Sequence, residues 1–422
     1  MIALVDCNSF FCSVEKVFHP GLDGKPVCVM SSNDGCIVAL TPEAKQLGIK
    51  RGDPVFKVKD IIRLNQVKMF STNMQLYAAM SRRIVNLLRQ SIQHVENYSI
   101  DESFCYLDGY DRLCPLDELM RGVAENIRLC TDIPVSVGIA PSKTLAKMGS
   151  KFAKQYKGYR GVCCIDTEAK RRKALELFEL ADVWGVGRQT LQKLNYYGIR
   201  TPLEWADKKE SWVRTRFNKP VVQTWYELNG VSCIDTTEVV RNQSLCSSRS
   251  FGQMVDDLPS LKASVATFAS SCAGKLRGQH AGCKAVTVFL HSNRFREDLP
   301  QYDNTATYTF LTPTADTIEI TQAALHILED IYRPGILYKK SGVVVSQITD
   351  MNGVQGNLFD PIANRSERMD LMQAIDRLNL RYGPKTVKLT VEGEEQQRWK
   401  VKCDHRSGNY LTDIREILTV RI

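Results

Sequence analysis

The sequence YSIDESF at residues 98–104 decides the fold of this chain. Apolar and polar residues alternate on the way into it and on the way out, and this period of two predicts two β-strands. Adjacent side chains on a strand point to opposite faces, so Asp101 and Glu102 converge only where the backbone turns. At a hairpin tip both carboxylates would face one point, where Mg²⁺ would relieve their repulsion. A solvated turn is the alternative, and this stretch alone favours it.

The N-terminus adds a third carboxylate. Residues 2–5 (IALV) form an apolar run typical of a buried strand, and Asp6 follows directly. A carboxylate at the end of a buried strand is costly unless it is paired or bound to metal. Asp6 could instead cap a helix that begins near residues 8–9. Together with Asp101 and Glu102 on neighbouring strands, it would suffice to hold two Mg²⁺ ions for in-line phosphoryl transfer.

Length and composition limit the class of protein. A chain of 422 residues with 43% hydrophobic residues predicts more than two domains with substantial cores. We expect no membrane span and no signal peptide, because no apolar run is long enough and Asp6 interrupts the first one. The 14 cysteines lack metal-site spacing and indicate reduced residues of a cytoplasmic protein. A net charge of +9 fits a polyanionic partner.

A basic helix follows the predicted hairpin. Residues 135–139 predict a strand, and Ser142 predicts the N-cap of the next helix. Lys143, Lys147 and Lys154 lie at i, i+4 and i+11, close to one face of that helix. A solvated face is the usual explanation for such a run. Because this helix leads away from the carboxylates, we favour contacts with phosphate.

Two further modules follow along the chain. Residues 181–199, with Gly185 and Gly187, predict a helix-hairpin-helix, whose glycines let backbone N–H groups approach a DNA phosphate. This motif reads no base and also occurs in nucleases and ligases. From residue 246 to residue 348 the apolar periods predict strand, helix, strand, strand, helix and strand, a βαββαβ order. A last helix, with a stripe of Leu371, Ile375, Leu378 and Tyr382, precedes Gly383.

Three of these motifs resemble the Y-family translesion DNA polymerases: DCNSFF at 6–11, YSIDE at 98–102 and PSKTLAK at 141–147. The resemblance covers nearly the whole chain and is closest to the UmuC-like members, which include plasmid-borne proteins. It implies an α+β multidomain right-hand fold with a ferredoxin-like palm, small fingers, a helical thumb and a βαββαβ little finger. The implied boundaries are palm 1–25 and 72–170, fingers 26–71, thumb 171–238, little finger 239–350 and a C-terminal interaction region 351–422.

The resemblance also implies roles for individual residues. Asp6, Asp101 and Glu102 would be the catalytic ligands of two Mg²⁺ ions, assisted by the Cys7 carbonyl. Phe11 would be the steric gate that presses on the sugar and excludes ribonucleotides, although taken by itself it is typical of a core position. The nucleotide would contact Lys154 and Lys45. The DNA backbone would contact Lys143, Lys147, Gly185, Gly187, Arg241, Arg249 and Lys284.

The fingers depart from the family pattern at one place. Many relatives carry Tyr and Arg where this chain has Pro42 and Lys45. Lys45 can still supply positive charge to a triphosphate, but without the bidentate fork of arginine. The tyrosine contact does not transfer to Pro42. A solvated helix face is the alternative interpretation of Lys45.

The C-terminal region suggests protein partners. The sequence QGNLF at 355–359 resembles peptides that dock on the bacterial sliding clamp, with Gln355 for orientation and Leu358 and Phe359 as apolar anchors. The resemblance further implies primer-template DNA, dNTP, a processed UmuD-like dimer and RecA as partners. The expected activity is error-prone translesion synthesis in SOS mutagenesis. A two-metal nuclease, a nucleotide cyclase and a non-catalytic DNA-binding scaffold remain as alternatives.

Overall fold

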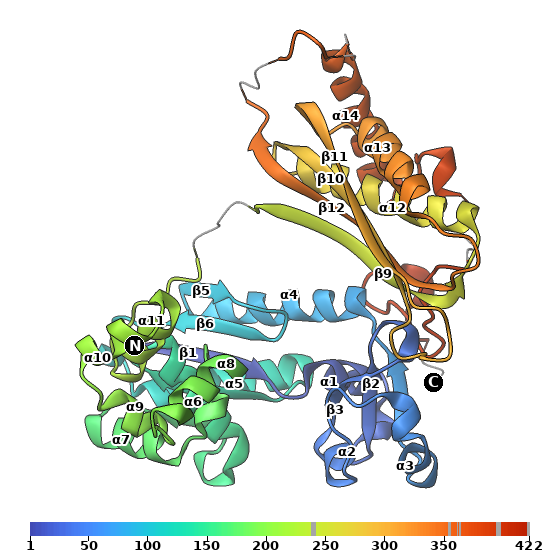
Figure 1. Ribbon diagram of the computed structural model, residues 1–422. Helices are drawn as coiled ribbons and strands as arrows, with labels where there is room; N and C mark the ends of the chain where they lie inside the picture. The colour runs from blue at the N-terminus through green and yellow to red at the C-terminus, as the bar shows by residue number, and fades with distance from the viewer. Residues whose placement is uncertain (238–241, 353–355, 361, 363, 394–397, 420–422) are drawn as a thin grey trace. The chain divides into compact units, whose positions relative to one another are not determined.

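The computed structural model describes residues 1–237, 242–352, 356–360, 362, 364–393 and 398–419 (Figure 1). The chain forms two units. The first contains Met1–Ser31, Gly35–Glu238 and His405–Ile422, and the second contains Ser32–Asp34 and Val239–Asp404. Within the described part of the chain, no helix has the length and apolar character needed to cross a membrane.

A five-stranded sheet of order β5-β6-β1-β7-β8 forms the centre of the first unit. Strand β1 lies antiparallel to both β6 and β7, whereas β8 lies parallel to β7. The predicted first strand, hairpin and strand at 135–139 are thereby confirmed, but β8 was not predicted. The strands are β1 Ile2–Cys7, β5 His94–Asn97, β6 Glu102–Tyr106, β7 Val135–Ala140 and β8 Val162–Cys164.

Helices cover both faces of this sheet, and the alternation along β1 shows which residues meet which helices. Ala3 and Val5 belong to the core formed with α1, α4 and α5. Ile2 and Leu4 belong to the core formed with α6. Because the period is two, Asp6 lies on the α6 side of the sheet. The helices are α1 Phe10–Val17, α4 Met74–Ser91, α5 Leu116–Thr131 and α6 Lys143–Gln155.

Two glycines allow α6 to lie close to the sheet. A Cβ on Gly138 of β7 would overlap backbone atoms of Ala146 and Ser150. A Cβ on Gly149 of α6 would lie 3.0 Å from the Cα of Gly138. The predicted N-cap is confirmed, because the side chain of Ser142 accepts a hydrogen bond from the N–H of Leu145. These contacts fix where the lysines of α6 meet the sheet.

A small three-stranded sheet of order β3-β2-β4 lies between α1 and α4 in the sequence. It has its own core, which includes Cys28, Ile37 and Ile49. The sequence patterns did not predict β3 and β4. The elements are β2 Val27–Met30, β3 Ile37–Leu40, α2 Pro42–Gln46, α3 Lys59–Leu64 and β4 Lys68–Ser71.

A helical region around the fully buried Trp205 completes this unit. Its helices are α7 Glu168–Leu177, α8 Arg188–Tyr196, α9 Pro202–Ala206, α10 Glu210–Arg216 and α11 Lys219–Leu228. Gly185 has φ +90°, a conformation that favours glycine, and Gly187 is the N-cap residue of α8. The turn before α8 thus has the predicted helix-hairpin-helix form.

The second unit contains an antiparallel sheet of order β11-β10-β12-β9, with α12 and α13 packed against it (Figure 1). The chain order is βαββαβ, as predicted from the sequence. The elements are β9 Ser244–Val255, α12 Leu258–Arg277, β10 Ala281–Ser292, β11 Asp303–Thr314, α13 Thr317–Ile331 and β12 Tyr338–Asp350.

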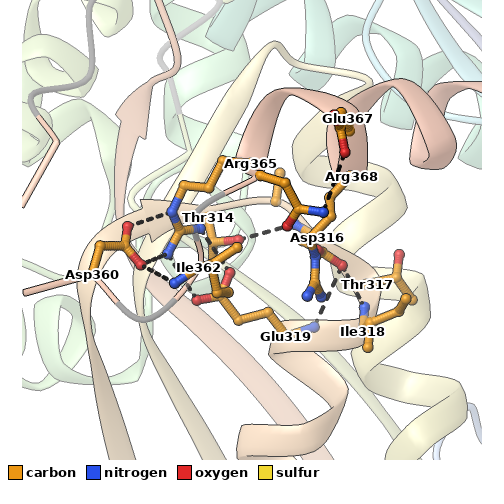
Figure 2. A network of polar contacts seen from close by, with 12 residues as sticks. Thr314, Asp316, Thr317, Ile318, Glu319, Asp360, Ile362, Arg365, Glu367 and Arg368 are labelled. Carbon is orange, nitrogen blue, oxygen red and sulfur yellow. Dashed lines mark hydrogen bonds and ion pairs between the residues drawn. The ribbon is translucent and has the colours of Figure 1, made fainter.

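Helix α14, Arg365–Tyr382, is attached to this unit mainly by ion pairs (Figure 2). The Arg365 guanidinium bonds Asp360 and, at 2.9 and 3.1 Å, Glu319. Arg368 bonds Asp316, the N-cap residue of α13. The helix ends before Gly383 as expected, but its apolar stripe is not buried. Met372 is the buried residue, whereas Leu371, Leu378 and Tyr382 are exposed, because charged contacts set the orientation of the helix.

Candidate active site

Two of the three predicted carboxylates lie directly opposite each other. In the antiparallel pairing of β1 with β6, Asp6 is the partner of Glu102. Directly opposed residues on antiparallel strands point to the same face, so both face α6. Asp101 lies in the turn immediately before β6, and its carbonyl accepts a 2.9 Å hydrogen bond from the N–H of Cys7. The structure therefore brings these distant parts of the sequence together, while their role as metal ligands stays a prediction.

Ser99 organises the turn that carries Asp101. Its Oγ donates to Asp101 Oδ1 at 2.7 Å and accepts from the N–H of Glu102 at 3.1 Å. The N–H groups of Tyr98 and Ser99 both donate to the Glu102 carbonyl, at 3.1 and 3.0 Å. Sequence analysis missed this serine. A serine two residues before an aspartate at a hairpin tip is the pattern that indicates such a side-chain turn.

Two lysines of α6 bond the carboxylates. Lys154 Nζ lies 2.8 Å from Asp6 Oδ1, and Lys147 Nζ lies 2.7 Å from Glu102 Oε1. Burial raises the pKa of the Asp6 carboxyl, Lys154 opposes that shift, and the neighbouring Asp101 adds to it. The Asp6 carboxylate is thus in surroundings that favour a cationic partner.

Among the described residues, no group of three or more His, Cys, Asp and Glu side chains is arranged to hold a metal ion. The donor set nevertheless fits Mg²⁺. Asp6, Asp101 and Glu102 supply hard carboxylate oxygens, and the negative charge of Asp101 adds to the upward shift of the Asp6 pKa. The ammonium groups of Lys147 and Lys154 satisfy the same negative charge that a divalent cation would neutralise.

Lys143 does not fit its predicted role in DNA binding. Its side chain is 2% exposed, and its Nζ lies 2.9 Å from Glu96 Oε2 and 2.6 Å from Thr236 Oγ1. The ammonium also lies 5.1 Å from the centre of the Phe104 ring. A phosphate cannot reach a charge that is buried in this way, so the prediction is wrong for Lys143. This lysine joins α6 to the edge strand β5.

Lys147 lies among aromatic rings that sequence analysis missed. Its ammonium is 4.8 Å from the centre of the Tyr98 ring and 5.4 Å from that of Trp184. The two rings meet edge to face at 5.7 Å. With 18% of its side chain exposed and its charge paired with Glu102, Lys147 contacts the candidate site directly. Its contact with DNA stays a prediction.

Phe11 lies in the first turn of α1 and is half-buried. Its ring stacks on the fully buried Tyr77, with centroids 4.5 Å apart and an interplanar angle of 15°. The preceding Phe10 is 3% exposed and belongs to the core. Phe11 therefore has one covered face and one partly open side, whereas its role as a steric gate stays a prediction.

The remaining predicted residues belong to other elements of the two units. Lys45 is exposed in the last turn of α2. A Cβ on Gly185 would lie 2.5 Å from Thr224 Oγ1, whereas one on Gly187 would contact nothing within 4 Å. The predicted residues of the second unit that the structure describes are all exposed: Arg249, Lys284, Leu358 (93%) and Phe359 (81%). Arg241 and Gln355 lie outside the described residues.

Family models match most of the chain. The impB/mucB/samB family matches residues 5–151, and the C-terminal domain of that family matches residues 242–358. A domain of unknown function matches residues 369–420. The matches include the candidate site and the βαββαβ unit.

Individual relatives agree with the family models. Protein UmuC of Salmonella typhimurium is 39% identical over 423 residues, covering 100% of both chains. Protein ImpB of Salmonella typhimurium is 37% identical over 426 residues, also covering 100% of both. DNA polymerase IV of Saccharolobus solfataricus is 35% identical over 207 residues, which are 47% of this chain and 56% of that protein.

Solved structures confirm the predicted fold class. A chimeric Y-family DNA polymerase, 22% identical, matches 83% of this chain and 100% of its own with a TM-score of 0.63. This likeness concerns the fold alone, and the full-length match to Protein UmuC identifies the group within that fold. This chain therefore belongs to the impB/mucB/samB family, the UmuC-type Y-family DNA polymerases.

Proposed function

We propose that this DNA-directed DNA polymerase carries out error-prone translesion synthesis with Asp6, Asp101 and Glu102 as ligands of two Mg²⁺ ions. The observation that carries the proposal is the pairing of Asp6 with Glu102 across β1 and β6, beside the turn that holds Asp101. Carboxylates so close together need cationic partners, and this chain belongs to a polymerase family. The expected process is SOS mutagenesis.

Each residue of the site would have a separate role in nucleotidyl transfer. When bound, Mg²⁺ would lower the pKa of the primer 3′-hydroxyl and neutralise the leaving pyrophosphate. Ser99 holds the Asp101 carboxylate in place, and the Cys7 carbonyl would assist. Lys154, with 42% of its side chain exposed, would exchange its bond to Asp6 for one to a triphosphate oxygen. The long flexible stem of a lysine allows such a move.

Sugar and base would be selected by shape. One face of the Phe11 ring stacks on Tyr77. We propose that Phe11 is the steric gate that presses on the sugar. Lys45, on the exposed side of α2, would add charge near the triphosphate. Base choice would depend on pairing in a loosely enclosing site, which is why we expect low fidelity.

The domain roles and partners complete the proposal. We assign the palm to residues 1–25 and 72–170, the fingers to 26–71, the thumb to 171–238 and the little finger to 239–350. The N–H groups at Gly185 and Gly187, and the side chains of Arg249 and Lys284, would contact DNA phosphates. Exposed Leu358 and Phe359 would dock on a sliding clamp. A UmuD-like dimer and RecA are further proposed partners.

Primer extension on a damaged template tests the proposal, with Mg²⁺, the processed UmuD-like dimer and a RecA filament present. We expect Asp101→Ala to abolish extension and Glu125→Ala to leave it unchanged, because Glu125 forms only an exposed ion pair with Arg128 on α5. Equal extension by wild type and Asp101→Ala would overturn the assignment. Loss of a labelled primer in the absence of dNTPs would indicate a nuclease instead.

A further inference from the structure

The C-terminal segment, which we define as residues 405–412, belongs to the first unit and extends its small sheet. The N–H of His405 donates to Ser71 Oγ, and the N–H of Ser71 donates to the His405 carbonyl, both at 3.0 Å. Arg406 forms a parallel β-bridge with Ser71, the last residue of β4. The segment thus continues the ladder beyond an edge strand of the sheet.

Asn73 holds the backbone of the same segment. Its Oδ1 caps α4 by accepting from the N–H of Leu76 at 3.3 Å. Its Nδ2 donates to the carbonyls of Ser407 and Gly408, at 3.0 and 3.2 Å, and also lies 3.2 Å from Ser407 Oγ, which accepts from it. Because Asn73 is 1% exposed and uses both ends of its amide, the start of α4 and the C-terminal segment share one buried connection.

Glu15 connects this segment to the interior of α1. Its carboxylate is fully buried, and Oε1 accepts hydrogen bonds from the hydroxyls of Tyr77 at 2.6 Å and Ser407 at 2.9 Å. Its Oε2 has no hydrogen-bond partner among the described residues. A buried carboxylate is costly unless it is hydrogen-bonded, and the Ser407 hydroxyl supplies one of the two hydrogen bonds that the described residues give to this group.

The contacts continue from Glu15 to the ring proposed to select the sugar. Glu15 and Phe11 are four residues apart on α1 and therefore lie on the same side of the helix. Tyr77 bonds Glu15 through its hydroxyl and stacks on Phe11 through its ring. The path Ser407, Glu15, Tyr77, Phe11 is thus continuous, because two side-chain hydrogen bonds and one ring stack connect its members.

We propose that Ser407 is a positioning residue for sugar selection: by bonding Glu15 it holds the Tyr77 ring on which Phe11 rests. The C-terminal segment would therefore sharpen discrimination against ribonucleotides while touching neither nucleotide nor metal. This inference rests on the steric gate proposed for Phe11. It gives the buried Glu15, which the proposed chemistry does not use, a function at the same site.

Single-nucleotide primer extension with the full chain and its partners tests this, measuring kcat/KM for a dNTP and for the matching rNTP. Losing one such hydrogen bond corresponds to about a fivefold change, so we expect Ser407→Ala to lower the dNTP/rNTP ratio about fivefold. The change should come from faster rNTP use. Ser407→Thr should restore the ratio because it retains the hydroxyl. Thr412→Ala is the control. Thr412 lies in the same segment, but its hydroxyl accepts a hydrogen bond from Gln75 of α4 and has no bond to Glu15.

Two further variants separate the possible failures. Tyr77→Phe keeps the stacked ring but removes the hydroxyl that reaches Glu15, so it should reproduce the effect of Ser407→Ala. An unchanged dNTP/rNTP ratio in Ser407→Ala, or an equal loss of kcat/KM for both nucleotides, overturns the inference. In that case Phe11→Ala should still abolish discrimination if the steric gate is correct. An unchanged ratio in Phe11→Ala overturns the proposed steric gate itself.

Discussion

Gly138→Ala tests whether the close approach of α6 to β7 holds the candidate site together. An alanine Cβ there would lie 2.7 Å from the carbonyl carbon of Gly149 and would overlap backbone atoms of Ala146 and Ser150. All these atoms belong to the helix backbone, which cannot rotate away as a side chain can. The helix would therefore have to move off the sheet as a body.

The expected cost follows from the kind of contact. Adding a methyl group to a packed core lowers the free energy of unfolding by about 1–3 kcal/mol. Because the obstacle here is rigid backbone, we expect Gly138→Ala to cost about 3 kcal/mol. Gly149→Ala should cost less, because its Cβ would lie 3.0 Å from the nearest atom. Gly122→Ala is the matched control. It lies in α5 with nothing within 4 Å, and alanine there should stabilise by about 0.5–1 kcal/mol.

Urea denaturation followed by circular dichroism measures these differences, and primer extension measures their consequence. Helix α6 carries Lys147 and Lys154, whose ammonium groups lie 2.7 and 2.8 Å from Glu102 and Asp6. Hydrogen bonds weaken steeply with distance, so folded Gly138→Ala should also extend primers poorly. A free energy of unfolding within about 0.5 kcal/mol of wild type would refute the packing argument.

Three further predictions concern buried charge. Burial raises the pKa of the Glu15 carboxyl, although hydrogen bonds from Tyr77 and Ser407 and the nearby His19 oppose the shift; the Cys12 thiol also lies close. The ionisation of Glu15 therefore destabilises the folded state as the pH rises. Glu15→Gln keeps an acceptor, and its melting temperature minus that of wild type should rise from pH 4 to pH 7.5; a falling difference contradicts this. Lys143→Met leaves the Glu96 carboxylate without its ion-pair partner and should lower the free energy of unfolding in urea by about 3 kcal/mol, with an unchanged salt slope of DNA binding. A slope reduced by about one would mean a phosphate contact. Arg365→Ala should make α14 more sensitive to proteolysis because it removes two ion pairs, whereas Arg381→Ala should not.

The elements that sequence analysis identified share a clear period or a clear end. Helix α1 begins at Phe10, close to the start near residues 8–9 expected from the sequence. The hairpin at 94–106 was predicted from alternation. In contrast, the short strands β3, β4 and β8, of three or four residues each, were not predicted. Two of them, β4 and β8, pair in parallel with β2 and β7, and a parallel pairing requires a crossover connection.

The candidate site was predictable in its carboxylates but not in its lysines. Spacing placed Lys143 and Lys154 near one face of a helix, and both do lie on α6. It could not show that Thr236, 93 residues further along the chain, would help to bury Lys143, nor that Lys154 would bond Asp6. A run of positive charge gives the sign of a surface, whereas the partner of each charge depends on tertiary packing.

The position of Asp6 along β1, more than its residue type, determines what it can do. Ile2 and Leu4 point the same way as Asp6, and both are buried under α6. A carboxylate at residue 4 would be enclosed by apolar atoms and would favour its neutral form. Two residues later the apolar cover ends and lysines take its place, so a charge at residue 6 is paired yet 25% exposed. The same strand therefore contributes Ile2 and Leu4 to the core and, near its end, the Asp6 carboxylate, whose proposed role is to exchange Lys154 for a metal cation.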